Sequence, residues 1–78
     1  MDSIALLERT FGHYGDKCKV TVSNGDTYTG IYRGYGESTR ENPLMLRLGL
    51  SKSEATRIGV PYLAEIGIPY DVITAVDF

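Results

Sequence analysis

Cysteine and histidine are almost absent from this 78-residue chain, which contains one of each. The lone Cys18 excludes a disulfide within the chain, and together with the lone His13 it leaves too few ligands for a structural zinc site. A chain this short buries only a modest core and commonly depends on disulfides, a metal or an oligomer for support. We therefore expect one domain, residues 1–78, that is stabilised by association with further copies of itself.

Long apolar runs and an excess of positive charge are missing as well. No segment is long enough to cross a membrane, and the acidic opening stretch does not resemble a signal peptide. A free thiol fits a reducing compartment, so we expect a cytoplasmic protein with no membrane partner. The formal net charge of −2 argues against a duplex-binding protein but leaves room for a narrow single-strand site.

Residue patterns typical of catalysis are not found either. His13 stands alone between glycine-flanked residues, and Cys18 alternates with valines in a pattern typical of a buried thiol. Glu65 and Asp71 flank one predicted turn and fit a polar rim better than an acid–base pair. The sequence contains no phosphate loop and no metal-ligand spacing, so we expect no enzyme activity, no cofactor and no metal.

The first predicted element is a short amphipathic helix over residues 3–10. Asp2 or Ser3 can cap its start, and glycines follow its end. Apolar side chains recur at helical spacing on one face: Ile4, Leu7 and Phe11. A helix this short is not stable alone and must dock on the rest of the chain.

A change to period-two alternation at Lys17 predicts a β-hairpin around Asn24-Gly25. A two-residue loop would pair the valines of the first strand with threonines of the second. A three-residue loop, with Gly25 left-handed, instead aligns Val20 and Val22 with an inward row of Tyr28, Gly30 and Tyr32. Only the second register builds an apolar face, so we predict the bulged hairpin.

Glycine is unusually frequent in the second strand of this hairpin. Gly30 and Gly34 fall on the predicted inward face between tyrosines. Strand glycines are costly unless the strand must bend or another backbone must come close. The alternative is that these glycines have no structural role, but their regular spacing favours a sharp bend of the kind that closes a small barrel.

Three further strands are predicted in the second half of the chain. Residues 44–50 alternate with four leucines inward, at Leu44, Leu46, Leu48 and Leu50. A polar loop, with room for a helical turn, leads to a fourth strand at 60–66, and "GIP" then forms a tight turn. A fifth strand covers 71–77, anchored by Ile73 and Val76. The predicted fold is mainly β: a short N-terminal helix followed by a five-stranded, strongly bent antiparallel meander that forms a small barrel.

The order and spacing of these elements resemble the Sm and Sm-like protein family, which includes the bacterial Hfq branch. The stretch "VTVSNGDTYTGIYRGYG" matches the layout of the family's first motif without a gap, at Val20, Val22, Gly25, Tyr28, Gly30, Tyr32 and Tyr35. The stretch "IPYDVITAV" resembles the second motif, with Ile68, Ile73 and Val76 in place. The resemblance implies a barrel that assembles into a ring and binds single-stranded RNA or organises an RNA–protein particle.

The chain departs from the family pattern where Sm-like proteins hold a base. Gly36 stands where an aspartate is usual, and Asn42 matches the following asparagine only after a two-residue insertion. Pro69-Tyr70 replaces the usual Arg-Gly. The usual uridine pocket is therefore missing or rebuilt.

The resemblance nevertheless implies candidate RNA contacts in the two loops that would face the pore of a ring: Tyr35, Arg40, Asn42 and Tyr70. Tyrosine stacks on bases, and arginine pairs with phosphate or stacks. The alternative is that Tyr70 packs on the barrel rim while Arg40 pairs with a neighbouring glutamate.

A ring would use the fourth and fifth strands, because Sm-like proteins pair these strands between neighbours and unpaired edges invite such pairing. The candidate interface residues are Val60, Leu63, Ile66, Val72 and Ala75. In a monomer, the N-terminal helix would cover these strands instead.

The sequence thus predicts a homo-oligomeric ring that binds RNA. The alternative is a protein-binding or structural module that has lost its RNA contacts, and a barrel that resembles Sm only by convergence is a third reading.

Overall fold

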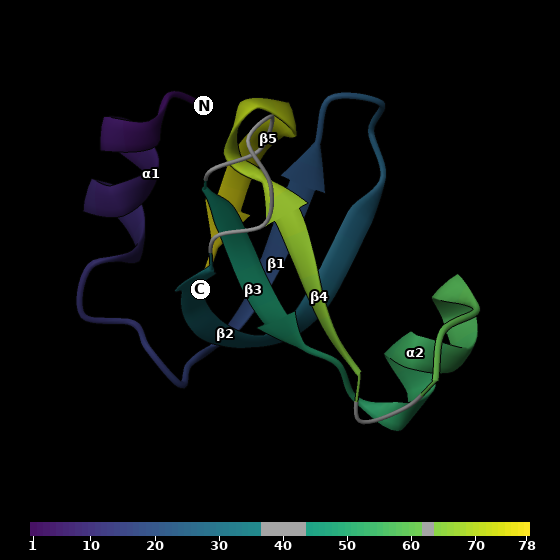
Figure 1. Ribbon diagram of the computed structural model, residues 1–78. Helices are drawn as coiled ribbons and strands as arrows, with labels where there is room; N and C mark the ends of the chain where they lie inside the picture. Colours follow the sequence, from purple (N-terminus) through teal and green to yellow (C-terminus); the bar gives the residue numbers. More distant parts are fainter. Residues whose placement is uncertain (37–43, 62–63) are drawn as a thin grey trace.

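The computed structural model describes residues 1–36, 44–61 and 64–78 (Figure 1). Its elements, in chain order, are α1 (Ser3–Thr10), β1 (Lys17–Val22), β2 (Thr27–Gly36), β3 (Met45–Gly49), α2 (Lys52–Ile58), β4 (Glu65–Pro69), the 3-10 helix η1 (Tyr70–Val72) and β5 (Ile73–Asp77). The five strands form one antiparallel sheet in the order β4-β3-β2-β1-β5. The predicted class is confirmed, but the sheet is not a simple meander, since β5 returns to pair with β1.

The β1–β2 hairpin has the predicted register. Val20 lies opposite Tyr28 and Cys18 lies opposite Gly30, as the three-residue loop requires. Gly25 has a φ of 92°, in the left-handed region that a glycine bulge needs. Tertiary packing reinforces this register, because Cys18, Val20 and the following Val22 are all buried.

Two glycines bend β2 in different ways. Gly30 faces the core, and a Cβ at that position would lie only 2.6 Å from the backbone oxygen of Gly49 on β3. Gly34 has a φ of 80° and lies where the β2–β3 register shifts, between Tyr32 and Tyr35. Gly34 is therefore part of a bulge rather than an inward position of a regular strand.

The core is built from the strand alternation that the sequence predicts. Leu46, Leu48 and Leu50 of the β3 segment are buried, and Ile73 and Val76 anchor β5. Residues between the leucines remain half-buried on the other face. The bent sheet wraps around this core, with α1 and α2 on opposite sides of it (Figure 1).

Helix α1 has the predicted bounds but docks through a different face. Its N-cap is Asp2, whose Oδ1 accepts from the Ala5 N–H at 2.8 Å. Leu6 and Thr10 are the buried residues, whereas the predicted apolar face is exposed: Ile4 by 67%, Leu7 by 46% and Phe11 by 88%. The docked face is both apolar and polar, because Leu6 is fully buried in the core and the Thr10 hydroxyl bonds to the Tyr35 hydroxyl on β2.

The second half of the chain differs from the prediction in three places. Residues 52–58 form helix α2 rather than a polar loop, and Gly59 ends it in the left-handed conformation. Strand β4 covers Glu65–Pro69 rather than 60–66, because Ile66 and Ile68 pair with Leu48 and Leu46 of β3. The predicted "GIP" turn therefore lies inside β4, and the chain turns instead in η1, which delays the start of β5 to Ile73.

Candidate functional site

Two unpaired strand edges lie at the ends of the sheet. In the part of the chain that the structure describes, β4 pairs only with β3 and β5 pairs only with β1. Such edges present backbone N–H and C=O groups that a strand of another chain can bond. On β5, the N-terminal segment already uses two of these groups: the Val76 carbonyl accepts from Arg9 Nε at 2.7 Å, and the Ile73 carbonyl accepts from the Met1 amine. Beside β4 is a hollow of about 380 Å³, lined by Val22, Tyr28, Ile58, Val60, Ile66, Gly67, Ile68, Pro69 and Val72. Most of the side chains that line it are apolar.

The predicted interface residues gather around this hollow. Val60, Ile66 and Val72 line it, and all three side chains are half-buried. Ala75 lies on β5 opposite Thr21, is half-buried and does not line the hollow. Leu63 lies outside the described residues. The structure thus brings together three residues that are separated in sequence, although only Ile66 belongs to a strand.

Of the predicted RNA contacts, the structure describes Tyr35 and Tyr70. Gly36 of β2 pairs with Met45 of β3, which pairs in turn with Pro69 of β4. Tyr70 follows immediately, and its backbone N–H donates to the Leu44 carbonyl at 3.2 Å. Leu44 therefore lies beside Tyr70, whereas Gly36 is separated from β4 by β3. Arg40 and Asn42 themselves lie outside the described residues.

Tyr35 has a structural contact that accounts for its position. Its hydroxyl donates to the Leu6 carbonyl of α1 at 3.2 Å and also bonds to Thr10. Burial raises the pKa of this hydroxyl to about 12. Its ring packs edge-on against Tyr32, with the ring centroids 5.8 Å apart. Tyr35 therefore fastens α1 to the sheet.

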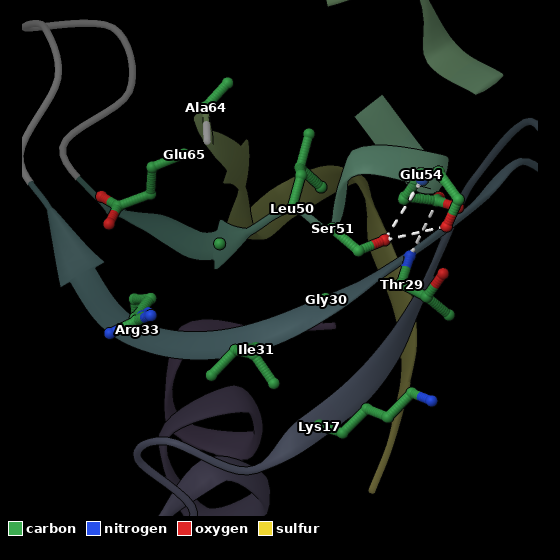
Figure 2. A pocket seen from close by; sticks show the side chains of 12 residues that line it. Lys17, Thr29, Gly30, Ile31, Arg33, Leu50, Ser51, Glu54, Ala64 and Glu65 are labelled. Carbon is green, nitrogen blue, oxygen red and sulfur yellow. Dashed lines mark hydrogen bonds between the residues drawn. The ribbon is translucent and has the colours of Figure 1, made fainter. Parts of the chain in front are cut away.

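A second hollow, of about 570 Å³, opens beside the middle of β2 and was not predicted (Figure 2). Its lining includes two cations, Lys17 and Arg33, with Ile31 and the bare backbone of Gly30 nearby. The signal in the sequence was the hairpin register, which places Lys17 opposite Ile31 on the neighbouring strand and Arg33 two residues after Ile31 on β2. It was missed because the β3–β4 connection, which completes the hollow, was not expected to be helical.

Glu54 ties α2 to β2 at the edge of this hollow. Its Oε1 accepts from the Thr29 backbone N–H at 3.2 Å, and its carboxylate pairs with Arg57, whose Nε lies 3.0 Å from Oε2. Arg57 lowers the pKa of this carboxyl to about 2, with a smaller contribution from the Thr29 N–H and despite opposing desolvation. Glu54 is therefore ionised and fully partnered at neutral pH.

The residues considered for catalysis have structural partners. His13 Nδ1 lies 2.9 Å from Asp16 Oδ2, and its ring stacks on Phe78 with the centroids 3.9 Å apart. Cys18 is 3% exposed, and burial raises the pKa of its thiol to about 11. Within the described ranges, no three His, Cys, Asp or Glu residues cluster in a way that could hold a metal ion. Among the helices that the structure describes, none is long and apolar enough to cross a membrane.

Comparisons of the chain with protein-family models, with curated proteins and with solved structures find no match. The geometry of the edges and hollows is therefore the basis for a functional assignment.

Proposed function

We propose that this chain is a non-catalytic, Sm-like ring protein in which β4 of one copy pairs with β5 of the next. The observation that carries the proposal is that, among the described strands, β4 and β5 end the sheet and each pairs with a strand on one side only, with a hollow beside β4. A contact between two different edges is heterologous, so it repeats from copy to copy and closes into a ring when the rotation allows. Pairing also removes both edges from solvent, which protects the chain against uncontrolled association.

The arrangement of elements supports the Sm-like part of the proposal. A short N-terminal helix precedes five antiparallel strands, as the Sm resemblance implies, although helix α2 lies between β3 and β4. The bend is built into β2 by Gly30 and by the Gly34 bulge. These features support the Sm-like architecture. The proposed ring assembly rests on the strands at the two ends of the sheet.

Single-stranded RNA is the proposed ligand of the ring. Tyr70 is half-buried and lies beside Leu44, the described residue that follows the segment carrying Arg40 and Asn42. In a ring, each copy would supply one such tyrosine, and aromatic side chains bind single strands by stacking on bases. Tyr70→Ala is expected to weaken binding of a labelled oligo-U or oligo-A in a filter-binding assay, by about five- to tenfold for one stacking contact.

A protein-binding or structural module is the second candidate. The observation that favours it is Tyr35, whose hydroxyl is held by α1 and is not directed to a ligand. Under this reading the wild type binds no oligonucleotide at low salt, and Tyr70→Ala changes the affinity for a protein while leaving assembly intact. The oligonucleotide assay therefore separates the two candidates.

The edge contact can be tested separately from RNA binding. Val72→Lys places a charge in the apolar hollow beside β4, and we expect it to shift the protein from an oligomer to monomers in analytical ultracentrifugation. Thr56→Lys is the matched control, because it adds the same charge at an exposed position on α2. An oligomer that survives Val72→Lys, or a wild-type protein that is monomeric at all concentrations, would contradict the proposed contact.

A further inference from the structure

The 570 Å³ hollow beside β2 differs from the rest of the molecule in its charge. Lys17 and Arg33 line it, and neither side chain makes an ion pair or hydrogen bond with another described residue. Both side chains are exposed. Unpaired cations at a concave surface attract anions more strongly than cations scattered on a convex surface.

The two carboxylates in the lining are already neutralised. Glu54 pairs with Arg57, and Glu65 Oε1 accepts from Arg47 Nη1 at 2.9 Å. Neither arginine lines the hollow. The lining itself therefore carries two cations and two carboxylates, but each carboxylate is paired with an arginine outside it, so the charges of Lys17 and Arg33 are the ones that no described residue pairs.

The shape of the hollow suits a chain of phosphates rather than a compact ion. Figure 2 shows Lys17 and Arg33 toward opposite ends of the lining, with the apolar side chain of Ile31 between them. Lys17 lies opposite Ile31 in the β1–β2 register, and Arg33 follows Ile31 by two residues on β2. The volume is also within the range of about 300–1,000 Å³ typical of ligand sites.

We propose that this hollow binds phosphate groups of a nucleotide ligand, with Lys17 and Arg33 as the phosphate contacts and Ile31 beneath the sugar or base between them. The proposal rests on the proposed RNA function for its preferred source, the backbone of a single strand. A free nucleotide has the same chemistry and is the other source. The site is distinct from the sheet end that carries Tyr70, so a strand bound here would follow the outer side of β2.

The test measures fluorescence anisotropy of a labelled ten-nucleotide oligo-A and oligo-U at several salt concentrations. Lys17→Gln and Arg33→Gln are each expected to weaken binding about fivefold, as for the loss of one exposed charge contact. Each substitution should also reduce the slope of log K against log salt by about 0.7, the value for one phosphate on a single strand. Both side chains are exposed, so circular dichroism should show an unchanged fold.

Lys19→Gln is the matched control for this experiment. Lys19 is an exposed lysine on the same strand, two residues from Lys17, and does not line the hollow. A site-specific effect leaves its affinity within about twofold of the wild type, whereas general attraction to a positive surface would weaken it as much as Lys17→Gln.

The outcomes separate this inference from the proposed function. If the wild type binds oligonucleotide and Lys17→Gln and Arg33→Gln bind as tightly as Lys19→Gln, the hollow is not the site and the RNA function stands. If the wild type binds no oligonucleotide at low salt, the RNA function fails, and titration with adenosine monophosphate decides the site. Nucleotide binding that is lost in Lys17→Gln and Arg33→Gln would support a free-nucleotide site, and no nucleotide binding would overturn it.

Discussion

Replacing Gly30 by alanine is expected to destabilise the fold, because the added methyl group meets the backbone of the adjacent strand. A Cβ at Gly30 would lie 2.6 Å from the Gly49 carbonyl oxygen and 3.3 Å from its carbon. Cβ atoms in proteins essentially never come within 3.0 Å of another heavy atom in this way. Because both contacts are backbone atoms, β2 or β3 must move to relieve them.

The magnitude follows from two opposing effects. Overpacking a well-packed interior costs about 1–3 kcal/mol of unfolding free energy. Alanine also restricts the unfolded chain relative to glycine, which returns about 0.4–1 kcal/mol where the native backbone is compatible. The expected net loss is about 1–2 kcal/mol, and at about 4–8 °C per kcal/mol for a domain of this size the Tm should fall by about 4–16 °C.

Thermal and urea unfolding at one fixed protein concentration measure this loss, since association makes the Tm depend on concentration. Gly67→Ala is the matched control on β4. Its Cβ would meet the end of the flexible Met45 side chain, at 3.1 Å from Cε and 3.3 Å from Sδ, so the methionine can move away. A Gly30→Ala protein as stable as Gly67→Ala would refute the view that the close approach of β2 and β3 requires glycine.

Three further predictions concern individual side chains. Glu54→Gln should lower the unfolding free energy by about 1–2 kcal/mol at pH 7. Arg57 depresses the pKa of the Glu54 carboxyl in the folded state to about 2 from 4.5, so the stability difference from the wild type should shrink between pH 4.5 and pH 2. Urea unfolding over this pH range measures the difference, and a pH-independent difference would contradict the prediction. Tyr35→Phe removes the donor to the Leu6 carbonyl and should cost about 1 kcal/mol, seen as faster hydrogen exchange of α1 amides than of sheet amides; unchanged α1 exchange would contradict the docking role. Cys18, buried and with its pKa raised to about 11, should react with a thiol reagent at pH 8 only after denaturation, and rapid native labelling would contradict its burial.

The β1–β2 hairpin and β3 could be predicted from the sequence because local pattern and tertiary packing agree there. The Asn24-Gly25 turn and the valine alternation select the same register, and the leucines of β3 have one apolar face. The bounds of α1 were equally clear from Asp2 and the following glycines. Its buried face was not, because that face consists of Leu6, which packs in the core, and the polar Thr10, which bonds to Tyr35 of β2.

The extent of helix α2 and the bounds of strand β4 differ from the prediction for different physical reasons. Ser51 and Glu54 have the Ser-x-x-Glu spacing of a capping box, and Gly59 stands at the usual left-handed stop, so the signal for α2 was present. The bounds of β4 depend on which residues pair with β3, and that is decided by tertiary contacts of Ile66 and Ile68. Pro69 is tolerated at the end of β4 because an edge strand needs fewer N–H donors.

The candidate site was predictable only in part, since its residues come from segments that the sequence separates. Val60 and Val72 line the same hollow as Ile66 from the connection after α2 and from η1, although the sequence predicted both residues in strands. The charged hollow is formed by the β1–β2 hairpin together with α2 and its flanking segments, and only the hairpin register was predicted in full.

The most direct test of the central claim is native mass spectrometry of the full chain without crosslinker. Pairing of the free β4 and β5 edges predicts a single closed oligomer, of roughly five to eight copies, with no ladder of intermediate sizes. A monomer over the whole concentration range would contradict the ring, and an isologous dimer would show that the two edges do not join head to tail.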